Sequence, residues 1–139
     1  MKLSTRNQLK GIVNSIIKGA INTEVSIDLP GGTKIVSVIT NGAVKSLELE
    51  VGKTAYVLIK SSNVIIGVDI QKISARNVLT GKISSILEGS VNDEISINLG
   101  SGYTITAVIT KSSVASLGLE VGVVASAIIK ASDVILAVD

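Results

Sequence analysis

The chain has neither cysteine nor histidine among its 139 residues. Disulfide bonds, thiolate chemistry, zinc sites built from Cys and His, and catalytic triads that use an imidazole are therefore excluded. Aromatic residues are limited to Tyr56 and Tyr103, so the core has to be built from Val, Ile, Leu and Ala. The sequence also lacks a recognisable nucleophile–base pair or metal-binding cluster, and we expect a protein that is not an enzyme.

Strong charge and long apolar runs are missing as well. The net charge of +2 is too weak to indicate nucleic-acid binding, and nucleic-acid-binding barrels stack bases on aromatic side chains that this chain lacks. No apolar run reaches the roughly 18 residues of a membrane span, and the N-terminal MKLSTRNQLKG lacks the apolar segment of a signal peptide. The segment LPGGTK follows a predicted strand but opens no helix, so it is not a phosphate loop. We expect a cytoplasmic protein that binds neither nucleic acid nor membrane.

What the chain does contain is one sequence unit written twice. A shift of 70 residues aligns the sequence with itself without a gap, and IKSSNVIIGVD at Ile59–Asp69 matches IKASDVILAVD at Ile129–Asp139. We therefore expect two domains, residues 1–69 (the first repeat) and 70–139 (the second repeat), with almost no linker. Two copies are too few for a solenoid array.

Each repeat reads as an all-β unit. Alternating apolar residues and turn signals in the first repeat predict strands at 9–17, 23–29, 34–39, 54–60 and 64–68, and a short helix at 42–47 with Thr40 or Asn41 as its N-cap. Three strands, a short helix and two strands is the element order of a five-stranded OB-type barrel. We predict two tandem OB-fold-like barrels, each with a short helix between strands 3 and 4; a sandwich of the same strands is the alternative.

The fourth predicted strand, TAYVLIK in the first repeat and VVASAIIK in the second, is apolar on both faces. A single small barrel would leave one such face in water. The sequence therefore predicts a homo-oligomer.

The only two arginines occupy one position of the repeat, as Arg6 and Arg76. Most lysines are not reproduced between the repeats; the exceptions are the pairs Lys2 and Lys72, and Lys60 and Lys130. The polar residues around the two arginines, Lys60 and Lys130 are Ser4, Thr5 and Asn7 with Ser61 and Ser62, and Ser74 and Asn77 with Ser132, where Ala75 and Ala131 replace two hydroxyls. Such a set offers donors and no carboxylate, which suits a tetrahedral oxyanion. Gly11 and Gly81 follow the two arginines, and we expect them to leave room for backbone amides to approach the ligand.

A purely structural role for the same residues is the alternative. The arginines could cap a barrel end or bridge subunits through Asp69 and Asp139, and the lysines could protect a strand edge. The two basic segments could meet within one barrel or across a subunit interface.

A second repeated stretch is GAINTE at Gly19–Glu24, matched by GSVNDE at Gly89–Glu94. A turn with left-handed residues explains it structurally. If an oligomer axis passes here, backbone amides and Asn side chains of several chains could converge on an anion. Glu24 and Glu94 have no accompanying nucleophile or metal cluster and are read as solvated or as interface partners.

The motifs S-[TA]-R-N-x-L-x-G, then GA[IV]N[TA]E[VI], then LGLEVG, then A[VI]IKASDVI resemble the molbindin family, whose Mop-type units bind molybdate. The resemblance covers essentially the whole chain, twice, as in the tandem di-Mop proteins. It implies OB-like barrels assembled as trimers, with molybdate, and often tungstate, held at subunit interfaces and on the threefold axis. The implied role is cytoplasmic storage and homeostasis of molybdate without catalysis.

Carried onto this chain, the resemblance implies two kinds of site. The interface sites would use Ser4, Thr5, Arg6 and Asn7 against Lys130, Ala131 and Ser132, and Ser74, Ala75, Arg76 and Asn77 against Lys60, Ser61 and Ser62. The axial sites would use Gly19, Ala20 and Asn22, and Gly89, Ser90 and Asn92. The alternative function is an effector-sensing module that acts with a separate molybdate-responsive regulator or transporter.

Overall fold

The computed structural model describes all residues from Met1 to Asp139. The first repeat forms β1 (Asn7–Lys18), β2 (Asn22–Asp28), β3 (Lys34–Thr40), α1 (Asn41–Ser46), β4 (Thr54–Ile59), the 3-10 turn η1 (Ser61–Asn63) and β5 (Ile65–Gly67). The second repeat forms β6 (Asn77–Glu88), β7 (Asn92–Asn98), β8 (Thr104–Thr110), α2 (Lys111–Leu117), β9 (Val124–Ile129), η2 (Ala131–Asp133) and β10 (Ile135–Ala137). The predicted element order is confirmed, with the first strand longer than expected at both ends. No helix is long and apolar enough to cross a bilayer.

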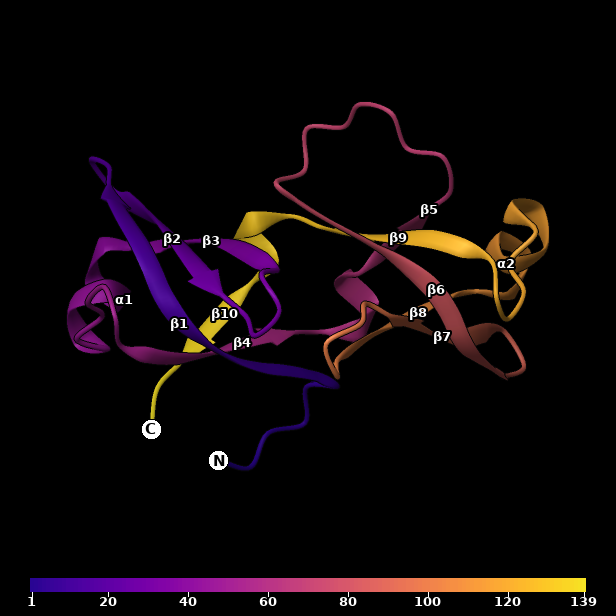
Figure 1. Ribbon diagram of the computed structural model, residues 1–139, viewed down its shortest axis with the longest axis horizontal. Helices are drawn as coiled ribbons and strands as arrows, with labels where there is room; N and C mark the ends of the chain where they lie inside the picture. Colours follow the sequence, from indigo (N-terminus) through magenta and orange to yellow (C-terminus); the bar gives the residue numbers. More distant parts are fainter. The chain divides into compact units, whose positions relative to one another are not determined.

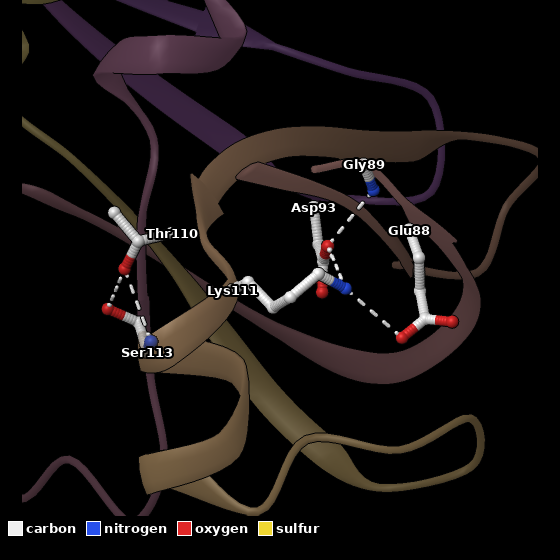
Figure 2. Close-up of polar contacts among 6 residues, drawn as sticks. All are labelled: Glu88, Gly89, Asp93, Thr110, Lys111 and Ser113. Atoms are coloured by element: carbon white, nitrogen blue, oxygen red, sulfur yellow. Dashed lines mark hydrogen bonds and ion pairs between the residues drawn. The ribbon is translucent and has the colours of Figure 1, made fainter. Parts of the chain in front are cut away.

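Local sequence explains where these elements begin and how they pack. Alternate residues of β1, among them Leu9 and Val13, are buried while their neighbours are exposed, as the period of a strand with one core face requires. The helix begins after Thr40, whose side chain accepts a hydrogen bond from the Ala43 amide at 3.1 Å. Thr110 caps α2 in the same way through the Ser113 amide at 3.2 Å (Figure 2). Of the two N-cap candidates, Thr40 is therefore confirmed.

The strands form two five-stranded sheets of identical topology. One has the order β10-β4-β1-β2-β3 and the other β5-β9-β6-β7-β8. The last strand of each repeat is thus built into the sheet of the other repeat: β10 pairs with β4, and β5 pairs with β9. Figure 1 shows the yellow β10 beside β4, among the indigo and magenta strands of the first repeat.

The compact units therefore differ from the repeats of the sequence. Unit 1 consists of residues 1–59 and 130–139, and unit 2 is the continuous segment 60–129. The boundaries predicted at 1–69 and 70–139 describe the duplicated sequence, whereas the sheets exchange the segment that follows β4 and β9. Sequence reasoning had placed each fifth strand in the barrel of its own repeat.

Each sheet curls around an aliphatic core. In unit 1 the edges β3 and β10 meet through η2, and the buried Ser37 hydroxyl donates to the Val134 carbonyl at 2.8 Å. The core of unit 1 includes Val25, Ile27 and Ile35, which are fully buried. The partly open five-stranded barrel that results is the OB-like fold predicted.

The second apolar face of β4 and β9 is covered only in part. Leu58 and Ile128 on that face are 4% and 1% exposed, whereas Val124 at the start of β9 is 53% exposed. The argument for an oligomer from this face therefore applies to Val124 and not to Leu58 or Ile128. Large apolar side chains are also exposed at the same positions of both repeats: Leu3 and Ile73, Ile17 and Leu87, Ile21 and Val91, Val51 and Val121, and Ile65 and Ile135.

Candidate functional site

Each arginine stands immediately before the long first strand of its sheet. Asn7 opens β1 and pairs with Ile59, the last residue of β4, while Asn77 pairs with Ile129 in the same way. Arg6 therefore lies at the end of the β1–β4 pair where the chain leaves β4. The guanidinium-bearing residues are exposed, whereas each neighbouring Asn is buried.

The asparagine beside each arginine has a structural task that the sequence did not reveal. Asn7 is only 2% exposed, and its Nδ2 donates to the Ile59 carbonyl at 3.1 Å. This bond ties the start of β1 to the end of β4, where the sheet ladder stops. Asn7 was predicted as an anion donor, and at least one of its two amide hydrogens is committed to the fold.

The exchange of the last strands decides which basic segments share a unit. Unit 1 contains Ser4–Asn7 together with Lys130–Ser132, and unit 2 contains Ser74–Asn77 together with Lys60–Ser62. We use the names unit-1 and unit-2 arginine clusters for these two sets, each defined by the compact unit to which both of its segments belong. The resemblance implied the same two combinations, but across a subunit interface. The grouping follows from β10 and β5 entering the opposite sheet.

Within the arginine clusters, hydroxyl and alanine positions compensate each other. Unit 1 has Thr5 with Ala131, whereas unit 2 has Ala75 with Ser61. The Oγ1 of Thr5 is buried and has no hydrogen-bond partner in the chain. A buried hydroxyl without a partner is costly unless something else supplies the bond. In the sequence, the unit-1 arginine cluster is followed directly by an acid, Asp133 after Ser132. The unit-2 cluster has the neutral Asn63 at that position.

Gly11 and Gly81 do not serve the ligand role that the sequence suggested. They were interpreted as leaving room for backbone amides to approach an anion. A Cβ at Gly11 would lie 2.6 Å from the Asp28 carbonyl oxygen, and one at Gly81 would lie 2.1 Å from that of Asn98. The space is filled by the neighbouring strand, so these glycines are required by strand packing.

The first-repeat turn, residues 18–22, is held by neutral hydrogen bonds. The Gly19 amide donates to the Asn22 carbonyl at 2.8 Å. The Nδ2 of Asn41 donates to the carbonyls of Gly19 and Ala20 at 3.0 and 3.3 Å, and the Thr23 hydroxyl donates to Asn41 Oδ1 at 2.6 Å. None of the residues 19–22 has a positive φ, so the expected left-handed turn is wrong.

The second-repeat turn, residues 88–92, is held by contacts of charged side chains (Figure 2). Asp93 is 2% exposed, and its Oδ1 accepts from the Lys111 ammonium at 3.1 Å and from the Gly89 amide at 3.2 Å. Lys111 Nζ also donates to Glu88 Oε1 at 3.2 Å. Hydrogen bonds to Asp93 and then Glu88 raise the pKa of Lys111 above its ordinary value.

Sequence reasoning missed the residues that hold the two turns. The signal was available in the repeat itself, because the position of Thr23 becomes Asp93 and the position of Asn41 becomes Lys111. A neutral pair that changes to an ion pair at both partners indicates spatial contact. Gly19 and Gly89, predicted as anion ligands, already donate their amides within the chain.

Comparison with known proteins agrees with this architecture. The TOBE domain matches residues 3–66 and again residues 73–136. A solved structure of a cytoplasmic molybdate-binding protein, ModG, with molybdate bound, superposes with a TM-score of 0.97 at 45% identity and covers 100% of both chains.

Curated relatives include both longer and shorter proteins. The chain is 44% identical over 139 residues to the molybdenum transport protein ModE of Azotobacter vinelandii. The match covers 99% of this chain but only 52% of that protein. It thus spans about half the length of such relatives. A probable molybdenum-pterin-binding protein of Haemophilus influenzae is 52% identical over 69 residues, which is 50% of this chain and 100% of the relative. The chain therefore belongs to the TOBE domain family and carries two copies of the domain.

Proposed function

We propose that this protein binds molybdate, and also tungstate, as a store that buffers the anion in the cytoplasm, without catalysis. The observation that carries the proposal is the superposition, over the full length of both chains, on a molybdate-binding protein with its ligand present. Because the identity is 45% and the TM-score 0.97, the same backbone is available here to hold the same kind of anion.

The arginine clusters supply suitable chemistry. Molybdate is a tetrahedral dianion with four acceptor oxygens, and a planar guanidinium can donate two parallel hydrogen bonds to such an ion. Arg6 and Arg76 are exposed, as are Lys60 and Lys130. The partnerless Thr5 hydroxyl is an additional donor in the unit-1 arginine cluster. We assign the primary anion sites to these clusters.

We also propose that the protein is a homo-oligomer, with a trimer as the expected form. Five pairs of large apolar residues are exposed at equivalent positions of the two repeats, as described above. A single exposed apolar residue needs no explanation. Exposed apolar residues at the same positions of both repeats indicate a surface that a partner covers. Anion sites completed by residues of a neighbouring subunit would then depend on assembly.

An effector-sensing role is the second candidate. It is favoured by the finding that the chain corresponds to about half of a longer molybdenum transport protein. In that case the same anion sites would regulate a separate partner. Storage and sensing differ in whether molybdate-loaded protein associates with that partner.

The test is titration calorimetry with molybdate, tungstate, sulfate and phosphate, together with native mass spectrometry of the loaded protein. We expect tight binding of molybdate and tungstate with several anions per oligomer. The double variant Arg6→Ala/Arg76→Ala should bind molybdate at least about 100-fold more weakly, because two charge-assisted hydrogen bonds are lost at each cluster. The matched control Lys10→Ala/Lys82→Ala removes the same charge at exposed positions that the repeats do not share. Equal losses in both variants would contradict the assignment to the arginines.

A further inference from the structure

The first-repeat and second-repeat turns carry opposite charge in this chain. The residues that differ are Lys18 against Glu88, Thr23 against Asp93, and Asn41 against Lys111. The first set has one positive charge, whereas the second has two negative charges and one positive. Glu24 and Glu94 stand at the same position after each turn, so they contribute the same formal charge to both.

The second-repeat turn already contains an anion of its own. The carboxylate of Asp93 is buried, and it takes the Gly89 amide and the Lys111 ammonium, at 3.2 and 3.1 Å, as its donors. Glu88 takes a further hydrogen of the same ammonium at 3.2 Å. The cation at this turn is therefore shared between two acids and is not available to an incoming dianion.

The hydrogen bonds that brace the first-repeat turn are made by neutral groups. Its bracing residues, Thr23 and Asn41, satisfy each other and two backbone carbonyls with neutral groups. The amides of Ala20 and Ile21 donate no hydrogen bond to another residue of the chain. Lys18, which is exposed, is the charged side chain at this turn, and it takes no part in the bracing hydrogen bonds.

From these contacts we propose that the two turns are not equivalent: an oxyanion binds at the first-repeat turn, and Asp93 with Glu88 excludes it from the second. The inference rests on the proposed molybdate binding and refines it, since the resemblance by itself implies like sites in both repeats. The two turns differ by two unit charges. At the short distance between a turn and a dianion bound to it, such a difference changes the affinity for the dianion by at least about tenfold, even at high dielectric constant.

Charge reversal at the two exposed turn residues tests the proposal. Lys18→Glu should weaken the turn-bound molybdate at least about tenfold, whereas Lys34→Glu, the same reversal at the opposite end of the β2–β3 pair, should not. Glu88→Lys should strengthen molybdate binding at the second turn. The triple variant Glu88→Lys/Asp93→Thr/Lys111→Asn, which installs the first-repeat residues, should add as many anions per oligomer as the first turn holds. Calorimetry and native mass spectrometry with molybdate give both quantities.

Three outcomes distinguish this inference from the proposed function. If the wild-type protein binds no molybdate, both are overturned. If binding is lost in Arg6→Ala/Arg76→Ala but Lys18→Glu behaves like Lys34→Glu, the function stands and the inference is overturned. If Lys18→Glu loses anions and Lys34→Glu does not, the inference is supported. The single exposed substitutions decide the matter even where the triple variant fails to fold.

Discussion

Glu48 and Gly118 occupy the same position after the short helix of each repeat, and both have a left-handed backbone, with φ of 52° and 64°. Glycine adopts this conformation without steric cost, whereas a residue with a Cβ is destabilised there by roughly 1–2 kcal/mol. Glu48→Gly should therefore stabilise unit 1 by about 0.5–1 kcal/mol after allowing for the added freedom of the unfolded chain. Urea unfolding measures the change. The control Glu50→Gly lies outside the left-handed region and should be neutral or destabilising.

Asn7 allows structural and ligand roles to be separated at one residue. Replacing it by Ala removes the side-chain bond to the Ile59 carbonyl and leaves the space of a buried amide empty. We expect a loss of about 0.5–1.5 kcal/mol in the free energy of unfolding. Asn14→Ala, which removes an exposed bond to Asp28 instead, should change it by less than about 0.5 kcal/mol. If the two variants are equally stable, the Asn7 amide has no structural task.

At the scale of elements, Gly81 decides how closely β6 and β7 approach. A Cβ there would lie 2.1 Å from the Asn98 backbone oxygen, and backbone cannot move aside as a flexible side chain can. Gly81→Ala should destabilise unit 2 by about 2–3 kcal/mol. Gly42→Ala is the contrasting glycine substitution, because its surroundings in α1 are open and alanine favours the helix by about 0.5–1 kcal/mol. Thermal melts that ranked these two variants in the reverse order would rule out this explanation of Gly81.

The elements themselves were readable from the sequence because their signals are local. The alternation of Val25, Ile27 and Leu29 fixed the second strand, and Thr40 marked the helix start as a capping residue. The repeated arginine position was readable for the same reason. The ion pair between Asp93 and Lys111 was not identified, because it joins residues 18 positions apart whose contact depends on the fold. Gly11 was misread because a glycine required by a neighbouring strand looks, in sequence, like one that leaves room for a ligand.

At the scale of the whole molecule, the exchange of β5 and β10 could not be predicted by sequence reasoning. The two strands are nearly the same, IIG and ILA, and they face equivalent partners in β9 and β4. Because each strand fits either sheet, hydrophobic pattern and register do not distinguish pairing within a repeat from pairing between repeats. The choice depends on the path of the chain after Ile59 and Ile129, for which the sequence offers no local signal.

The exchange of β5 and β10 between the sheets predicts that a substitution in the last strand of one repeat destabilises the sheet of the other repeat. Ile66 belongs to the first repeat but is buried in unit 2, where it pairs with Ala127. Leu136 belongs to the second repeat but is buried in unit 1 opposite Val57. A buried, unpaired carboxylate destabilises its surroundings by several kcal/mol. Ile66→Asp should therefore increase hydrogen–deuterium exchange in residues 77–129 and spare 7–59, and Leu136→Asp should do the opposite.

The two substitutions serve as controls for each other, because they place the same group at the same position of the repeat. General destabilisation would raise exchange in both segments in both variants. Pairing within each repeat would raise exchange in 7–59 for Ile66→Asp and in 77–129 for Leu136→Asp. Only the exchanged arrangement crosses the two responses, since the strand order joins β10 to β4 and β5 to β9. The same strand arrangement places Lys130 in the unit of Arg6. The hydrogen–deuterium exchange measurement therefore also tests which segments make up the unit-1 arginine cluster.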